Sequence, residues 1–167
     1  TGIGDTLKAV NPDMTIWAVE PENAAILSGG SIGTHVQMGI GDGLIPEILN
    51  QNIYNDICII KDDEAIKTAK DLASKEGIMC GISSGTNVAA AIKLAKKLGK
   101  GKRVVTVLPW KDWRRVRIVV FFPLLSAYFL AALIAHSFAS APEFPKNTFF
   151  IPVFSHSAFA KRAQGSV

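Results

Sequence analysis

Phenylalanine is absent from the first 120 residues of this 167-residue chain, and all nine phenylalanines lie between Phe121 and Phe159. Charge is also missing from one segment, because residues 118–142 contain no Asp, Glu, Lys or Arg. Both breaks in composition follow Pro109 and indicate that the chain has two parts. We therefore expect one α/β part over residues 1–109 and a divergent tail over residues 110–167.

Cysteine is scarce, and each of the two cysteines, Cys58 and Cys80, lies inside an apolar run. Such positions favour buried free thiols in a reducing compartment over a disulfide, so a cytoplasmic location is expected. No metal site is expected. Residues 1–30 also lack the basic and apolar segments of a signal peptide.

Acidic residues are scarce in the tail. Residues 1–109 hold 11 Lys+Arg and 12 Asp+Glu, whereas residues 110–167 hold 7 and 2. The basic sequence pI of 9.1 therefore belongs to the tail. No basic face is evident in the first part, so nucleic-acid binding is not expected.

The uncharged segment of the tail is long enough to cross a bilayer, and an arginine cluster, Arg114, Arg115 and Arg117, comes directly before it. This pattern predicts a transmembrane helix over about 118–139, which would make the chain membrane-associated. Pro123 lies inside the segment and argues against that helix. Out-of-frame sequence, produced by truncation, frameshift or missing splicing, is the alternative explanation of the tail.

Apolar strands and helical patterns alternate through the first part. Strands are predicted over residues 14–19, 57–60 and 103–108, and helices over residues 1–10, 61–75 and 83–98. Alternation of this kind is typical of a partial parallel sheet with flanking helices, in which ligands bind at the carboxyl ends of the strands.

Six glycines make residues 28–43 too glycine-rich for a regular element, and we call this segment the glycine loop. No strand leads into Gly39-Ile40-Gly41-Asp42-Gly43 and no Lys-Ser/Thr follows it, so the nucleotide-binding motifs do not fit. His35 is a candidate proton carrier, although a single histidine in a loop is more often structural.

Small polar residues open the helix predicted after Gly81. Ser83, Ser84 and Thr86 can cap free backbone N–H groups there, and the helix dipole favours a polar or anionic ligand. Taken alone, this stretch predicts no more than a capped helix.

Several motifs occur together in this order at consistent spacing, and together they resemble the cysteine synthase (O-acetylserine sulfhydrylase) family of fold type II pyridoxal-phosphate enzymes. The resemblance covers the first two thirds of the chain and ends at Pro109. The motifs are Thr1-Gly2-Ile3-Gly4, Leu7-Lys8, Ala18-Val19-Glu20-Pro21, Leu27-Ser28-Gly29-Gly30, His35, Gly39 to Pro46, Gly81 to Gly85 and Val104 to Pro109.

The resemblance implies a β-replacement reaction that makes cysteine from O-acetylserine and sulfide, with pyridoxal 5'-phosphate as the electron sink. It implies that Ser83 hydrogen-bonds the pyridine nitrogen of the cofactor, and Ser84 is then expected to cap the helix. Gly39, Gly41 and Gly43 would border the substrate. Val36 and Met38 depart from the family pattern His-Lys-Ile-Gln-Gly, in which those places carry Lys and Gln.

The same resemblance places the Schiff-base lysine and the phosphate-binding loop in a part of the family that precedes Thr1. No catalytic residue is therefore expected within this chain, and we expect the chain alone to be inactive. The family also implies a homodimer and binding of serine acetyltransferase.

Two alternatives stay open at this stage. The chain could be a non-catalytic, membrane-tethered or decoy subunit anchored by its tail. It could also belong to another β-family enzyme of the cystathionine β-synthase or threonine dehydratase type.

Overall fold

The structure is a computed structural model that describes residues 1–109, 117–121 and 148–151. It confirms the predicted α/β class. The first part contains α1 (Gly2–Val10), β1 (Thr15–Pro21), η1 (Glu22–Ala24), β2 (Asp56–Ile60), α2 (Asp62–Glu76), α3 (Ile82–Leu98) and β3 (Arg103–Leu108). Two further strands, β4 (Arg117–Phe121) and β5 (Thr148–Ile151), come from the tail.

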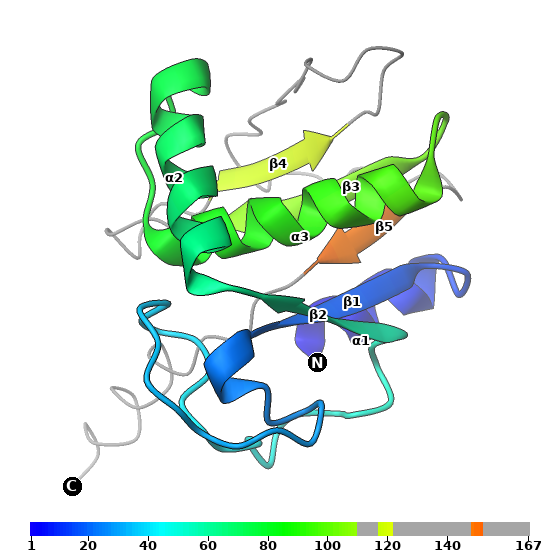
Figure 1. The fold of residues 1–167 in the computed structure, drawn as a ribbon. Helices are drawn as coiled ribbons and strands as arrows, with labels where there is room; N and C mark the ends of the chain where they lie inside the picture. Colours follow the sequence, from blue (N-terminus) through cyan, green and yellow to red (C-terminus); the bar gives the residue numbers. More distant parts are fainter. Residues whose placement is uncertain (110–116, 122–147, 152–167) are drawn as a thin grey trace, which may run out of the picture.

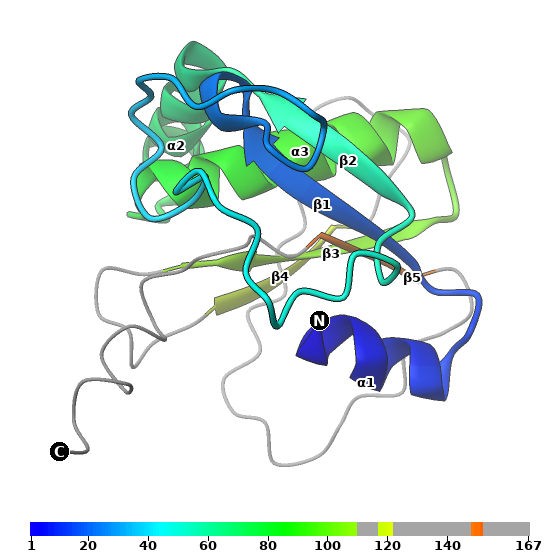
Figure 2. The ribbon, with the colours of Figure 1, turned by 90° about the horizontal axis from the view of Figure 1, so that it is seen from below.

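The strands form one sheet in the order β2-β1-β5-β3-β4. All neighbouring pairs are parallel except β3 and β4, which run antiparallel with Val105 opposite Val120. Helices α2 and α3 cover one face of the sheet, and α1 lies on the opposite face (Figures 1 and 2). Because β1, β2 and β3 run in the same direction, their carboxyl ends lie along one edge of the sheet.

Burial explains why these segments form the sheet. Six consecutive residues of β1, from Ile16 to Pro21, are buried, as expected for a central strand covered on both faces. The larger core cluster joins the sheet to α2 and α3 and includes Val19, Ile60, Val88, Leu94 and Val104. A smaller cluster of Met14, Ile16 and Val105 lies on the other face with Leu7 of α1 packed against it.

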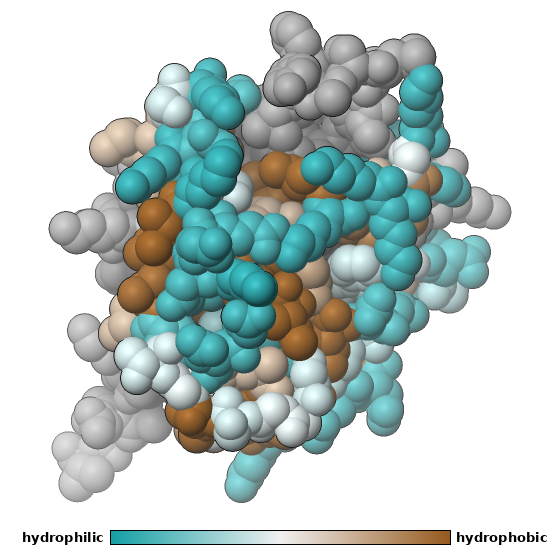
Figure 3. All heavy atoms as spheres, in the orientation of Figure 1, coloured by the Kyte–Doolittle hydropathy of each residue, from teal (hydrophilic) through white to brown (hydrophobic). Residues whose placement is uncertain are grey.

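Helices α2 and α3 are in close contact at Gly85. A Cβ atom at this position would collide with the carbonyl oxygen of Ala65 and would come within 3.0 Å of the Ala69 Cβ. The backbone that approaches Gly85 closely is therefore that of α2. The outward faces of the two helices are mainly hydrophilic (Figure 3).

The beginning of the apolar tail segment differs from the helix expected there. Residues 118–121 belong to β4, where Ile118, Val119 and Val120 pair with β3. Branched side chains of this kind favour strands, and β3 offers a free edge for pairing. The other residues of the predicted 118–139 span lie outside the described residues. Within the described part of the chain, no helix has the length and apolar character needed to cross a membrane.

Candidate functional site

The candidate site lies at the carboxyl edge of the sheet, where three strands end. The chain leaves β1 at Pro21 toward the glycine loop, leaves β2 at Ile60 toward α2, and leaves β3 at Leu108 toward Pro109. Helix α3 begins at the same edge, because the Ser84 hydroxyl donates a 2.8 Å hydrogen bond to the carbonyl oxygen of Pro109. In open parallel sheets this edge is the usual ligand-binding side.

The first turn of α3 differs from the capping arrangement predicted from the sequence. Gly81 occupies the N-cap position, and no side chain caps the helix. Ser84 is fully buried and bonded to Pro109, so the prediction that it caps the helix is wrong. Ser83 is partly exposed, and the first turn contains no acidic residue. Free N–H groups and one accessible hydroxyl thus lie at this helix start.

Glu20 holds the beginning of the glycine loop. Its carboxylate is buried at the end of β1 and accepts hydrogen bonds from Leu27 N (2.6 Å), Ser28 N (3.1 Å) and Ser28 Oγ (2.9 Å). Three donors satisfy a carboxylate that would otherwise be costly to bury. The loop therefore leaves β1 along a fixed path.

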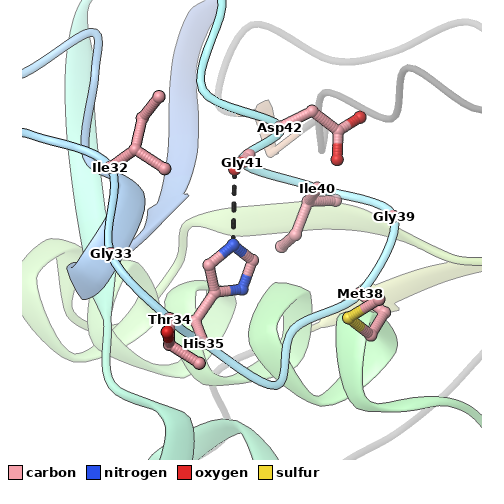
Figure 4. A pocket seen from close by; sticks show the side chains of 9 residues that line it. All are labelled: Ile32, Gly33, Thr34, His35, Met38, Gly39, Ile40, Gly41 and Asp42. Atoms are coloured by element: carbon pink, nitrogen blue, oxygen red, sulfur yellow. Dashed lines mark hydrogen bonds between the residues drawn. The ribbon is translucent and has the colours of Figure 1, made fainter.

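The glycine loop lines an open pocket of about 280 Å³. Ile32, Met38 and Ile40 are among its apolar lining residues, and His35 and Asp42 are polar ones (Figure 4).

Two glycines of the pocket need the conformational freedom of glycine. Gly39 and Gly41 have φ values of 88° and 68°, and a Cβ atom at Gly41 would come within 2.9 Å of Pro21 Cγ. Gly43 also has a positive φ, of 79°. The expectation that these three glycines border a substrate is not tested by the structure and stays a prediction.

The imidazole of His35 has a defined orientation in this pocket. Nε2 lies 3.3 Å from the carbonyl oxygen of Gly41 and must be the donor in that contact (Figure 4). Nδ1 is buried and has no hydrogen-bond partner among the described residues. In the tautomer with its proton on Nε2, the ring presents Nδ1 as an acceptor. The described residues include no proton partner for it, so its role as a proton carrier stays a prediction.

Gln37 connects the glycine loop to α3, and the sequence analysis missed it. Its amide nitrogen donates to the carbonyl oxygen of Ile60 (3.0 Å) and to Asp62 Oδ1 (2.8 Å), and its Oε1 lies 2.7 Å from Thr86 Oγ1. The Thr86 hydroxyl is also 3.1 Å from the carbonyl oxygen of Ile82 and was expected only to cap the helix. A single Gln between apolar Val36 and Met38 gave no signal of burial in the sequence.

Both thiols are free, as predicted. Burial raises the pKa of Cys58 above its ordinary value of 9.0. Cys80, one residue before the N-cap of α3, is partly buried, and burial raises its pKa while the Ser84 hydroxyl partly offsets this by hydrogen bonding. Neither thiol is therefore activated as a nucleophile.

Comparison with known proteins defines the class. Residues 1–109 match the family described as "Pyridoxal-phosphate dependent enzyme", and the chain belongs to this family. Particular relatives are cysteine synthases, which agrees with the resemblance seen in the motifs. The cysteine synthase of Staphylococcus aureus (strain N315) is 49% identical over 109 residues, which are 65% of this chain and 35% of that protein. The probable cysteine synthase of Bacillus subtilis (strain 168) is 46% identical over 105 residues, 63% of this chain and 34% of that protein.

Solved structures give the same result for the fold. A cysteine synthase from Entamoeba histolytica superposes with a TM-score of 0.58 at 28% identity, over 92% of this chain and 32% of that one. A hydrogen sulfide-producing enzyme from Fusobacterium nucleatum gives 0.56 at 35% identity, over 59% and 33%. The chain spans about a third of the length of the curated relatives it matches.

Proposed function

We propose that residues 1–109 are part of a cysteine synthase, which makes L-cysteine from O-acetylserine and sulfide with pyridoxal 5'-phosphate. The observation that supports this most is the arrangement of the carboxyl edge of the sheet, where the start of α3 and the glycine loop lie together within the segment that matches the cysteine synthases. The cofactor, when bound, supplies the electron sink for elimination and replacement at the β-carbon.

Ser83 is the residue proposed to hold the pyridine ring. It is partly exposed and makes no side-chain hydrogen bond to any residue that the structure describes. A neutral hydroxyl can donate to the ring nitrogen but cannot hold a proton on it as a carboxylate would. The positive end of the α3 dipole and the lack of acidic residues in its first turn both disfavour a protonated, cationic ring. The residues present therefore fit the ring end of the cofactor.

The glycine loop is proposed to cover the substrate. Backbone at Gly39, Gly41 and Gly43 carries no side chain, so a ligand can approach its N–H and C=O groups closely. The tie from Glu20 to Ser28 holds one end of this cover in place. A cover of this kind excludes water from the reacting groups.

The covalent attachment of the cofactor is proposed to require a lysine from outside residues 1–109. A lysine nucleophile must lose its proton, which desolvation promotes. The lysines that form ion pairs in the structure have side chains between 43% and 74% exposed: Lys61, Lys67, Lys75, Lys93 and Lys97. None of the other lysines in residues 1–109 is buried either. We therefore propose that the isolated chain is inactive.

A chimera tests the proposal. Residues 1–109 are put in place of the matching 109 residues of the S. aureus cysteine synthase, and cofactor absorbance and cysteine formation are measured. We expect an active chimera in which Ser83→Ala lowers kcat/KM by roughly 10- to 100-fold, the equivalent of about 1–3 kcal/mol for a lost hydrogen bond. Ser74→Ala, the same change on the exposed face of α2, is the control. A folded, cofactor-loaded chimera unaffected by Ser83→Ala would remove the assigned role.

Another enzyme of the same family is the second candidate. The 35% identity to a hydrogen sulfide-producing enzyme supports it, because that enzyme also handles a sulfur group. Supplying the chimera with cysteine and measuring sulfide release, beside cysteine formation from O-acetylserine, separates the two activities.

A further inference from the structure

Gln37 is buried completely although its neighbours in the glycine loop are not. Its exposed fraction is 0%, whereas Val36 and Met38 are 41% and 78% exposed. A buried amide is costly unless its donors and its acceptor are all satisfied. Here both amide protons and the carbonyl oxygen have partners, so this side chain holds a single orientation.

The partners of Gln37 come from three different elements. Ile60 ends β2, Asp62 begins α2, and Thr86 lies near the start of α3, at its fifth residue. Asp62 holds the loop twice, because its Oδ1 accepts from Gln37 and its Oδ2 accepts from the backbone N–H of Val36 at 2.9 Å. Two consecutive loop residues are thus fixed to the helix that follows β2.

Thr86 is three residues from Ser83, within one turn of the same helix. On the loop side, Gln37 lies between His35 and Gly39, both of which line the pocket. A rigid tie from Gln37 to Thr86 therefore fixes the distance between the pocket wall and the helix start that presents the Ser83 hydroxyl.

We propose that Gln37 is a positioning residue that ties the glycine loop to the N-terminal part of α3 and so holds the loop and Ser83 at one spacing, an inference that rests on the proposed role of Ser83. The family pattern His-Lys-Ile-Gln-Gly, with which the glycine loop was compared above, carries an apolar Ile at the place of Gln37. An apolar residue there could fill the space but could not bond to Asp62 and Thr86.

Amide hydrogen exchange and ¹⁵N-resolved spectra of the full chain, with no cofactor added, test the tie. Gln37→Met keeps the length of the side chain and removes its hydrogen bonds. We expect the Val36 amide to exchange at least tenfold faster and the Ser83 amide resonance to shift, while interior amides of β1 and α3 stay within twofold of wild type. Gln51→Met, the same change at an exposed position, leaves both regions unchanged.

Two substitutions of Thr86 form a matched pair of variants. Thr86→Val removes the hydroxyl and is expected to speed exchange at Val36, whereas Thr86→Ser keeps the hydroxyl and is expected to restore slow exchange. Equal exchange in wild type and Gln37→Met, uniform acceleration over the whole core, or no difference between the two Thr86 variants would overturn the proposal. Because the measurement needs no cofactor, an inactive chimera with the tie intact would count against the proposed function alone.

Discussion

At the scale of single residues, buried polar groups determine the path of the glycine loop. Glu20 and Gln37 are both buried. Glu20 accepts from donors seven and eight residues further along the chain, whereas the partners of Gln37 lie 23 or more residues away. The loop has no helix or strand to support it between Gly30 and Gly43. These two side chains therefore help to determine its shape, together with the hydrogen bond from the Val36 N–H group to Asp62.

The first prediction concerns Glu20. Glu20→Gln replaces a carboxylate that accepts three hydrogen bonds by an amide whose nitrogen would face another donor. We expect the free energy of unfolding to fall by about 1–3 kcal/mol, the cost of an unsatisfied buried group, as measured by urea denaturation. Glu22→Gln is the control, since Glu22 is half-exposed and pairs only with exposed Lys61. Equal losses in the two variants would contradict the anchoring role.

The second prediction concerns alkaline pH and Cys58. Burial raises the pKa of this thiol in the folded state above its ordinary 9.0, with Glu64 and Asp56 adding to the effect of burial and Lys93 opposing it. The folded state then binds the proton more tightly than the unfolded state, so the stabilising effect is complete below pH 9 and is lost as the pH rises through the folded-state pKa.

Cys58→Val removes this titration at similar volume. We expect the unfolding free energy of the variant to fall less steeply above pH 9 than that of wild type, in denaturation curves taken at matched ionic strength. Parallel curves for the two proteins would show that the thiol is not responsible.

Residue roles were the least predictable part of the site. Ser83, Ser84 and Thr86 are chemically alike and adjacent, and the sequence offered all three as caps. In the structure Ser84 bonds to Pro109 and Thr86 to Gln37, both by contacts that link residues at least 25 positions apart. The residues next to each hydroxyl in the sequence do not indicate such distant contacts.

At the scale of helices and strands, the sequence predicted correctly those elements whose apolar residues follow a clear pattern. The predicted helix over 61–75 is α2, Asp62–Glu76, and it ends at Gly77, which adopts φ 65° as a left-handed C-cap. The strand over 103–108 matches β3. Strand β5 was not predicted, because its four residues gain their strand pairing from β1 and β3, which lie at least 40 residues earlier in the chain.

The third prediction tests the contact between α2 and α3. Gly85→Ala would ordinarily favour a helix, yet its Cβ would collide with the Ala65 carbonyl oxygen. We expect the overpacking to dominate and to lower the unfolding free energy by about 1–3 kcal/mol. Gly2→Ala in α1, where nothing lies within 4 Å of the new Cβ, is expected to be neutral or stabilising. Thermal unfolding of both variants measures the difference.

At the scale of the whole molecule, apolar side chains stay exposed beyond the core. Residues 32–48 contribute several of them, including Ile32 at 63%, Leu44 at 52% and Ile48 at 68% exposed. Strand β2 also forms an edge of the sheet, with Ile59 exposed on it. Exposed apolar groups and open strand edges both promote association.

The fourth prediction is that the chain self-associates with rising concentration. Leu44→Lys combined with Ile48→Lys is expected to weaken association at least tenfold, since burying each apolar side chain contributes about 1.5–3 kcal/mol. Sedimentation velocity measures the effect, and Ser74→Lys on α2 controls for added charge. Association unchanged in the double variant would place the contact elsewhere.

The position of β5 in the sheet has a consequence for synthesis on the ribosome. Strands β1 and β3 lie on either side of β5, so neither can complete its pairing until Ile151 has emerged. Inserting β5 between β1 and β3 requires contacts of long sequence separation, which form slowly. Until Thr148–Ile151 has been made, the nascent chain therefore has an unfilled place between β1 and β3, and this interval is when a chaperone would have most to protect.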